Sequence, residues 1–418
     1  MKRKLAALVG LMVLWCAGGA DGREWGRFRG PHGQGISDAK SIPVTWTEKD
    51  FLWKVELPGG GHSSPVVWRD RVFVTCEDPN GAGGIVVALE TRMGEVSWQK
   101  RYALAAYQHH ADNSLAAATP AVNAEGVCIL WQTAQTTIAA ALDHEGREVW
   151  RRDLPGIHSQ FGPGASPILV GDLLVFTHEQ EGDEGQYRSS WIALDRRTGQ
   201  TRWTVERKNS EISCSTPCVY QPEGGRAQIV FTSETNGVTG VDPATGSVLW
   251  ELPSALPARV VGSPVLAGDM VLNACGKGGT GKQLSAVRIP PSANDSPQLL
   301  YALTGKLIPY VPTPLAKDGL LYVFHDQGEV RCLRVETGEV LWSHKPAGRF
   351  YGSPVWVDGR LYALDRLGNV VVLAAGPAYK LLAVNPLGEK SHATPAVAGG
   401  WMYLRTYSHL ICLGGTGN

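Results

Sequence analysis

Short apolar segments separated by glycine and aspartate turns occupy most of the chain. Residues 66–68 and 72–74 flank one such turn, and residues 355–357 and 361–363 flank another. β-Branched and aromatic residues on both sides of a tight turn predict a β-hairpin. A Ser-Pro or Thr-Pro pair precedes each hairpin, and it occurs eight times: Ser64-Pro65, Thr119-Pro120, Ser166-Pro167, Thr216-Pro217, Ser263-Pro264, Thr313-Pro314, Ser353-Pro354 and Thr394-Pro395.

A third apolar segment and a tryptophan follow the hairpin in most copies. Segment 192–195, for example, leads through Thr198-Gly199 to Trp203, four residues after the glycine. We therefore expect each tryptophan on a fixed face of a fourth strand, packed between neighbouring modules. The repeat length averages about 47 residues, and four strands per repeat of that length are typical of a β-propeller blade. The same spacing recurs at Trp98, Trp150, Trp250 and Trp342.

The two ends of the repeat array complement each other. The eighth copy ends after three apolar segments, whereas residues 51–55 form an unassigned fourth strand ahead of the first copy. Pairing the two would remove an exposed sheet edge. The predicted fold is all-β, an eight-bladed propeller of four-stranded antiparallel blades over residues 51–418, with the last blade closed by the N-terminal strand. Residues 21–50 are an N-terminal extension whose Trp25 and Phe28 we expect to cap the propeller side, and Tyr301 replaces the tryptophan of blade five.

The Ala-Leu-Asp, Thr-Gly and Trp pattern resembles the repeat of the pyrroloquinoline-quinone (PQQ) type β-propeller family, over about residues 45–418. The resemblance implies one of two kinds of protein, a quinoprotein dehydrogenase or a non-catalytic propeller similar to BamB. The opening segment 25–31 (Trp-Gly-Arg-Phe-Arg-Gly-Pro) resembles that of secreted propellers from planctomycete-like bacteria.

The PQQ dehydrogenases of this family carry two adjacent cysteines, a tryptophan stacked on the quinone, a calcium site and a catalytic aspartate. No two cysteines are adjacent in this sequence, and the nearest pair is Cys214 and Cys218. Cys332 and Cys412 occupy a third-strand position that small residues fill elsewhere, which favours packing over redox chemistry. We therefore expect no cofactor, and PQQ with calcium remains the alternative.

The N-terminus indicates export. Residues 1–20 have a basic start, an apolar run and small residues before Asp21, the layout of a signal peptide. Cys16 leaves lipoprotein anchoring as an alternative, and no later segment is apolar enough to span a membrane. Three of the 39 basic residues lie in the signal, so 36 remain against 39 acidic ones. This balance argues against nucleic-acid binding. We expect an extracytoplasmic, periplasmic or secreted monomer.

The loops before the eight Ser/Thr-Pro pairs should surround one end of the central channel. Two histidines, His62 and His392, lie three residues before the proline in blades one and eight, which become neighbours when the ring closes. They are weak metal candidates, because two imidazoles without a third ligand are more often bonded to backbone or water. Asp112 beside His109 and His110 could form an acid–base pair. The candidate binding residues are His62, His110, Asn113, His158, Gln160, Arg259, Tyr310, Arg349, Tyr351 and His392.

These observations favour a non-catalytic extracytoplasmic scaffold that binds an envelope protein or a small ligand through the channel-rim loops. A degenerate quinoprotein oxidoreductase and a small-molecule or glycan sensor are the alternatives. The fold alone does not choose among them.

Overall fold

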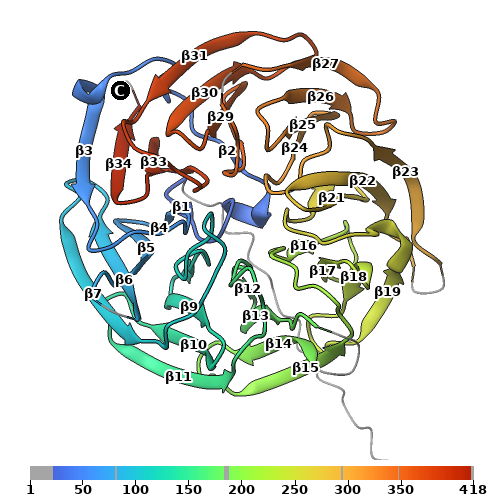
Figure 1. The fold of residues 1–418 in the computed structure, drawn as a ribbon, viewed down its shortest axis with the longest axis horizontal. Coiled ribbons are helices and arrows are strands. Elements are labelled where there is room, and N and C mark those ends of the chain that lie inside the picture. Colours follow the sequence, from blue (N-terminus) through green and yellow to red (C-terminus); the bar gives the residue numbers. More distant parts are fainter. Residues whose placement is uncertain (1–21, 81, 183–187, 293–294, 347, 416–418) are drawn as a thin grey trace, which may run out of the picture.

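Eight antiparallel sheets surround a central axis in the computed structural model (Figure 1). The structure describes residues 22–80, 82–182, 188–292, 295–346 and 348–415. The predicted signal peptide, with Cys16, lies outside the described residues. Each blade has four consecutive strands from the inner to the outer edge, except that the last blade takes its outer strand from the N-terminal part of the chain; a short strand of the N-terminal extension adds a fifth strand to two of the sheets. The eight-bladed all-β propeller predicted from the repeats is therefore confirmed.

The strands of the blades follow the chain order. Blades 1 and 2 consist of β4 (Val66–Trp68), β5 (Arg71–Glu77), β6 (Gly83–Glu90), β7 (Val96–Ala103), β8 (Ala121–Asn123), β9 (Gly126–Gln132), β10 (Thr136–Leu142) and β11 (Glu148–Pro155). Blades 3 and 4 consist of β12 (Ile168–Val170), β13 (Leu173–His178), β14 (Ser189–Asp195), β15 (Thr201–Arg207), β16 (Cys218–Tyr220), β17 (Gln228–Ser233), β18 (Gly237–Val241) and β19 (Val248–Leu252). Blades 5 and 6 consist of β20 (Val265–Ala267), β21 (Met270–Lys277), β22 (Thr280–Arg288), β23 (Gln298–Thr304), β24 (Leu315–Lys317), β25 (Leu320–Phe324), β26 (Val330–Arg334) and β27 (Val340–His344). Blades 7 and 8 consist of β28 (Val355–Val357), β29 (Arg360–Leu364), β30 (Asn369–Ala374), β31 (Leu381–Pro386), β32 (Ala396–Ala398), β33 (Trp401–Arg405), β34 (His409–Gly414) and β3 (Phe51–Glu56). Three short 3-10 helices are η1 (Pro31–Gly33), η2 (Glu48–Asp50) and η3 (Pro253–Ala255).

Burial differs between the inner and outer strands of a blade. Every residue of β9 is buried, whereas β11 alternates between exposed and less exposed positions, with Trp150 buried. The middle strands are covered on both faces by neighbouring blades, so apolar side chains suit both of their faces. The outer strand faces solvent on one side, which accounts for its polar alternation.

The predicted packing of tryptophans between blades is confirmed. The indole of Trp98 donates a 2.8 Å hydrogen bond to the carbonyl of His144 in the next blade, and its ring covers Gly146. Gly146 has φ +81°, and a Cβ added there would lie 2.6 Å from the ring. Tyr301 plays the same part in blade 5, because its hydroxyl donates to the carbonyl of Val335 at 2.7 Å. The regular Gly-to-Trp spacing therefore joins each of these blades to its neighbour.

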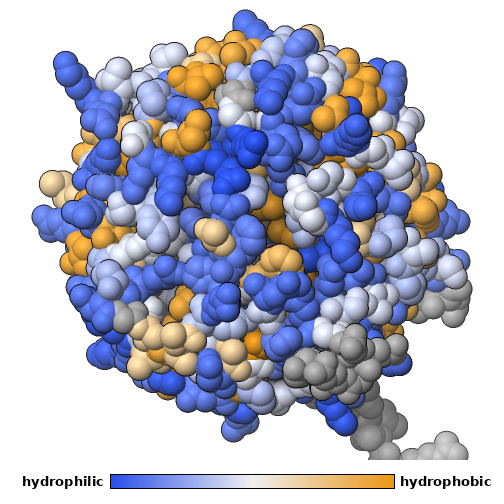
Figure 2. All heavy atoms as spheres, viewed as in Figure 1, coloured by the Kyte–Doolittle hydropathy of each residue, from blue (hydrophilic) through white to orange (hydrophobic). Residues whose placement is uncertain are grey.

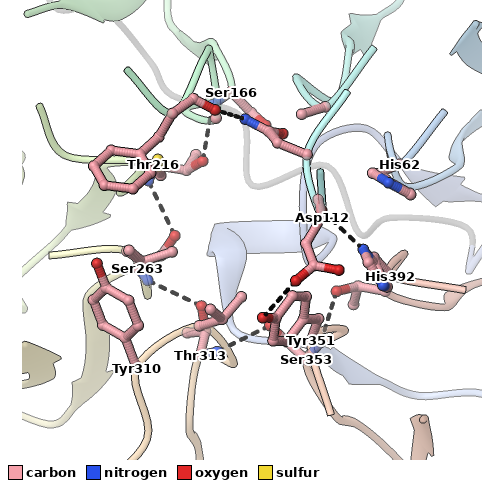
Figure 3. A pocket seen from close by; sticks show the side chains of 18 of the residues that line it. His62, Asp112, Ser166, Thr216, Ser263, Tyr310, Thr313, Tyr351, Ser353 and His392 are labelled. Carbon is pink, nitrogen blue, oxygen red and sulfur yellow. Dashed lines mark hydrogen bonds between the residues drawn. The ribbon is translucent and has the colours of Figure 1, made fainter. Parts of the chain in front are cut away.

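Two features close the ring. At the outer edge, β3 pairs with β34, so the N-terminal strand completes blade 8. At the inner edge, the backbone N–H of each Ser/Thr-Pro residue donates to the side-chain oxygen of the corresponding residue in the next blade, at 2.9–3.1 Å (Figure 3). The eight bonds form a complete circle: Ser64, Thr119, Ser166, Thr216, Ser263, Thr313, Ser353, Thr394 and back to Ser64.

The N-terminal extension lies across one end of the channel rather than along the propeller side. Its strand β1 (Glu24–Trp25) pairs with β4 of blade 1, and β2 (Ile36–Ser37) pairs with β28 of blade 7. Between them, the Arg29 guanidinium donates to four backbone carbonyl oxygens, including those of Thr313 and Pro314 in blade 6. The expected side cap is therefore wrong, since backbone pairing with innermost strands draws the segment to the axis. Among the described residues, no helix has the length and apolar character needed to cross a membrane.

Candidate functional site

The opposite end of the channel holds a cavity of about 360 Å³. Phe28 of the N-terminal extension and all eight residues of the Ser/Thr circle line it. The loops that precede the circle supply most of the remaining walls, together with Gly278 and Gly279 in the turn between β21 and β22. Figure 2 shows a mainly hydrophilic face with hydrophobic residues visible near its centre. The cavity is thus a dead-end recess whose mouth is built from loops on a rigid scaffold, a common arrangement for binding sites.

His62 and His392 stack at the mouth of this cavity, with ring centroids 4.4 Å apart (Figure 3). Burial, together with the neighbouring His392, lowers the pKa of His62 to about 2. Burial and the charge of Arg366 lower the pKa of His392 to about 4. Both imidazoles are therefore neutral at pH 7. Within the described ranges, no group of three or more His, Cys, Asp or Glu side chains is placed to hold a metal ion.

The loop between blades 1 and 2 reaches the far side of the mouth. Asp112 of this loop forms an ion pair with Arg366 of blade 7 and accepts a 3.3 Å hydrogen bond from the Tyr351 hydroxyl. Its backbone carbonyl lies 3.1 Å from Nδ1 of His392, which therefore donates to it. Asn113 donates to two carbonyls of the loop after blade 2, those of Phe161 and Pro163. We call residues 104–118 the strap, because they connect blades 2, 7 and 8 across the channel mouth.

A second group of side chains lies on the wall formed by blades 3 to 6. The guanidinium of Arg259 stacks 3.9 Å from the centre of the Phe161 ring. Its Nε donates to the carbonyl of Ile212 at 3.1 Å, and Nη2 lies 3.7 Å from the sulfur of Cys214. Tyr310 lines the cavity beside this group.

The loop that holds Tyr310 is fixed by a buried carboxylate. Asp326 accepts hydrogen bonds from the backbone N–H groups of Tyr310 and Val311 at 2.7 and 2.9 Å. Burial raises the pKa of Asp326 despite these bonds. The carboxylate holds the loop and does not line the cavity.

Seven of the ten predicted site residues line the cavity: His62, His110, Asn113, Arg259, Tyr310, Tyr351 and His392. The other three lie elsewhere. His158 and Gln160 bond to Glu181 beside blade 3, and Arg349 is exposed outside the cavity. The acid–base group predicted from Asp112, His109 and His110 is assembled only in part. His110 lies 4.0 Å from Asp112, whereas His109 lies 3.7 Å from Glu77.

Arg366, Phe28 and the turn residues Gly278 and Gly279 belong to the site but were not predicted. Arg366 follows the second strand of blade 7, Phe28 belongs to the extension, and the two glycines join β21 to β22. All four lie outside the segments that precede a Ser/Thr-Pro pair, so the repeat pattern contains no signal for them. All seven cysteines of the described residues are unpaired, and six are buried as the packing interpretation expected. Cys214, the exception, is half-buried and lines the cavity.

Comparisons with known proteins agree with this architecture. The family model described as outer membrane protein assembly factor BamB matches residues 44–154, 82–298 and 279–385. BamB of Yersinia pestis is 22% identical over 278 residues, which cover 63% of this chain and 66% of that relative, slightly less than two thirds of its length.

Two solved structures share the fold alone. BamB from Moraxella catarrhalis has a TM-score of 0.62 and 14% identity, covering 88% of this chain and 98% of its own. The quinohemoprotein alcohol dehydrogenase from Comamonas testosteroni has a TM-score of 0.64 and 13% identity, covering 95% and 81%. Both kinds of protein named by the resemblance therefore share this fold. The chain belongs to the family of outer membrane protein assembly factor BamB.

Proposed function

We propose that the protein is a non-catalytic, extracytoplasmic binding propeller that takes part of an envelope protein, or a small ligand, into the mouth of its central channel. The observation that carries the proposal is the recess itself, closed by Phe28 and the Ser/Thr circle and open between the strap and Arg259. His62 and His392 are neutral, and Asp112 is paired with Arg366. Nucleophile, base and orienting group are not assembled there as hydrolytic or transfer chemistry requires.

The residues of the recess do not fit PQQ with calcium. Calcium takes six to eight oxygen ligands, carboxylates prominent among them, whereas Asp112 is the one carboxylate among the described residues that lines the recess, and Arg366 pairs with it. The adjacent cysteines of the quinoprotein dehydrogenases also have no counterpart in the sequence. We therefore derive no redox step, and the proposed protein works without a cofactor.

The envelope location rests on two arguments. Residues 1–20 have the layout of a signal peptide, and the family and the Yersinia relative carry the name of an outer membrane protein assembly factor. We propose that this chain acts as a monomer outside the cytoplasm, on proteins of the cell envelope.

A binding experiment tests the proposed role. An unfolded outer membrane protein that carries a fluorophore is diluted from urea and titrated with the unlabelled, purified mature chain, and binding is followed by fluorescence anisotropy. We expect saturable binding that an unfolded cytoplasmic protein of similar length does not reproduce. Equal binding of both probes, or of neither, would overturn the proposal.

A second measurement addresses cofactors. The purified protein is examined for metal content and for a quinone absorbance band, and its melting temperature is followed during titration with PQQ and calcium. We expect no change, because ligand binding to the folded state alone would raise the melting temperature. A raised melting temperature with a quinone band would show that the protein is a quinoprotein.

A further inference from the structure

The recess contains a buried cation without a charged partner. Arg259 is only 4% exposed and lines the cavity; the charge of Glu181 favours its charged form, yet no carboxylate in the described part of the chain lies within ion-pair distance of it. A charged group removed from water is costly unless it is paired and hydrogen-bonded. A ligand with a negatively charged group could therefore supply the partner that Arg259 lacks.

Arg29 shows how this fold satisfies an arginine that has a structural role. That side chain is fully buried in the extension and donates to four backbone carbonyls. Arg259 donates to one carbonyl oxygen, that of Ile212, and its other polar neighbours are the Cys214 sulfur, a weak acceptor, and the Tyr310 hydroxyl. A guanidinium has five N–H donors in a planar fork, which matches a carboxylate with two parallel hydrogen bonds. Several N–H donors of Arg259 thus lack a strong acceptor and remain for a ligand in the cavity.

The surroundings of Arg259 specify what the rest of the ligand should be. Phe161 lies against one face of the guanidinium, and Tyr310, Val261 and Val311 line the adjacent wall. These side chains form an apolar and aromatic surface beside the cation. The volume of about 360 Å³ suits a small ligand or the end of a chain, since it is at the lower limit for ligand pockets.

We propose that Arg259 forms a carboxylate-binding subsite in the channel mouth, which takes an acidic group carried on an apolar or aromatic ligand. Either a free peptide C-terminus or an acidic side chain next to an aromatic residue provides this chemistry. The subsite deepens the proposed binding function and rests on it for its biological role, while its chemistry can be tested separately.

A matched pair of probes tests the charge requirement in the unmodified protein. N-acetylphenylalanine and N-acetylphenylalaninamide differ only in the carboxylate, and calorimetric titration compares their affinities. We expect the acid to bind at least about tenfold more tightly, because charge-assisted bidentate bonds are the stronger ones. The acid should also slow alkylation of Cys214 by iodoacetamide, since the thiol lies 3.7 Å from Nη2. Equal affinity of acid and amide, or no binding of either, would overturn the subsite.

Variants assign the effect to Arg259. Arg259→Met retains an apolar side chain against Phe161 and should abolish the preference for the acid. Arg349→Met removes an exposed arginine outside the cavity and should preserve it. If Arg259→Met does not melt cooperatively, Arg259→Lys takes its place and should reduce the preference, because lysine lacks the planar fork. An unchanged preference in a folded Arg259 variant would contradict the assignment.

A third probe, N-acetyl-aspartyl-phenylalaninamide, carries its carboxylate on a side chain. Tighter binding of this probe indicates an acidic side chain as the natural group, and tighter binding of N-acetylphenylalanine indicates a C-terminus; both results support the subsite. The outer membrane protein titration is run in parallel. If that protein binds but the acid is not preferred over the amide, the subsite alone is refuted. If the acid is preferred but that protein does not bind, the proposed partner is refuted and the subsite is established.

Discussion

The imidazoles of His62 and His392 stack 4.4 Å apart, although the residues come from opposite ends of the chain. Blade closure by β3 places them side by side, and each is half-buried. Nδ1 of His62 is buried and has no hydrogen-bond partner, while Nδ1 of His392 donates to the strap. The stacked pair therefore depends on closure of the ring by β3 and on the hydrogen bond between His392 and the strap.

Acid should destabilise the protein through this pair. Folding lowers both histidine pKa values, to about 2 and about 4, so the unfolded chain binds more protons below its own histidine pKa near 6.5. Stability is full above pH 6.5 and falls as the pH decreases toward 4, by up to about 1.4 kcal/mol per pH unit for each histidine.

Urea unfolding of the wild type and of His392→Gln between pH 7.5 and 4 measures this contribution. The variant should show a shallower loss of stability over that range, because one of the two protonation sites has been removed. His32, which lies in the extension away from the cavity, provides the control substitution His32→Gln. Parallel pH profiles for the wild type and His392→Gln would contradict the prediction.

Features that repeat in every blade could be predicted from the sequence. The Gly-to-Trp spacing and the Ser/Thr-Pro pairs recur because each module solves the same packing problem, and Tyr301 was recognised as a replacement by its position. Most of the fold follows from such local repeats. Seven site residues could be located for the same reason, since they precede a repeated motif.

The rest of the site depends on contacts that no repeat encodes. Asp112 reaches Arg366 because the strap crosses the channel, and Arg29 reaches blade 6 because the extension enters along the axis. His158 occupies a rim loop, yet a nearby carbonyl of Glu181 draws it away from the cavity. Hydrogen bonds and ion pairs between residues far apart in the sequence determine the conformation of each loop. A single sequence contains no regular pattern from which these contacts can be predicted.

Removing one oxygen from the Ser/Thr circle should weaken the whole ring. In Thr119→Val the buried N–H of Ser64 loses its acceptor, which costs about 1–3 kcal/mol of unfolding free energy. Thr119→Ser keeps the oxygen and should lose less. Urea unfolding followed by tryptophan fluorescence provides the comparison, and equal stabilities of the two variants would show that the circle contributes little.

The contact between Trp98 and Gly146 should tolerate no added methyl group. Gly146→Ala combines a positive φ with a Cβ 2.6 Å from the indole ring, so the packing conflict should cost about 1–3 kcal/mol in addition to the backbone strain. Gly171→Ala is the matched control, because Gly171 has φ +56° and nothing within 4 Å of the added atom. Thermal unfolding should therefore rank the wild type above Gly171→Ala and Gly171→Ala above Gly146→Ala; the reverse order of the two variants would contradict the role of the ring.

Releasing the strap should open the recess. In the wild type, Asp112 links the strap to blade 7 through Arg366 and Tyr351. Asp112→Asn removes the ion pair with Arg366. Both partners are partly exposed, so the pair contributes at most about 1 kcal/mol and the fold should persist. That energy corresponds to roughly a fivefold change in the population of an open strap, and alkylation of Cys214 should accelerate by a similar factor.

High salt should accelerate alkylation in the wild type and leave Asp112→Asn unchanged, because salt screens a partly exposed ion pair. Glu145→Gln, which changes an exposed carboxylate paired with Arg147 on blade 2, serves as the control and should react like the wild type. Identical alkylation rates in the wild type and Asp112→Asn at low salt would mean that the strap does not limit access to the recess. A faster rate in the variant would assign the opening of the binding site to the bond between Asp112 and Arg366.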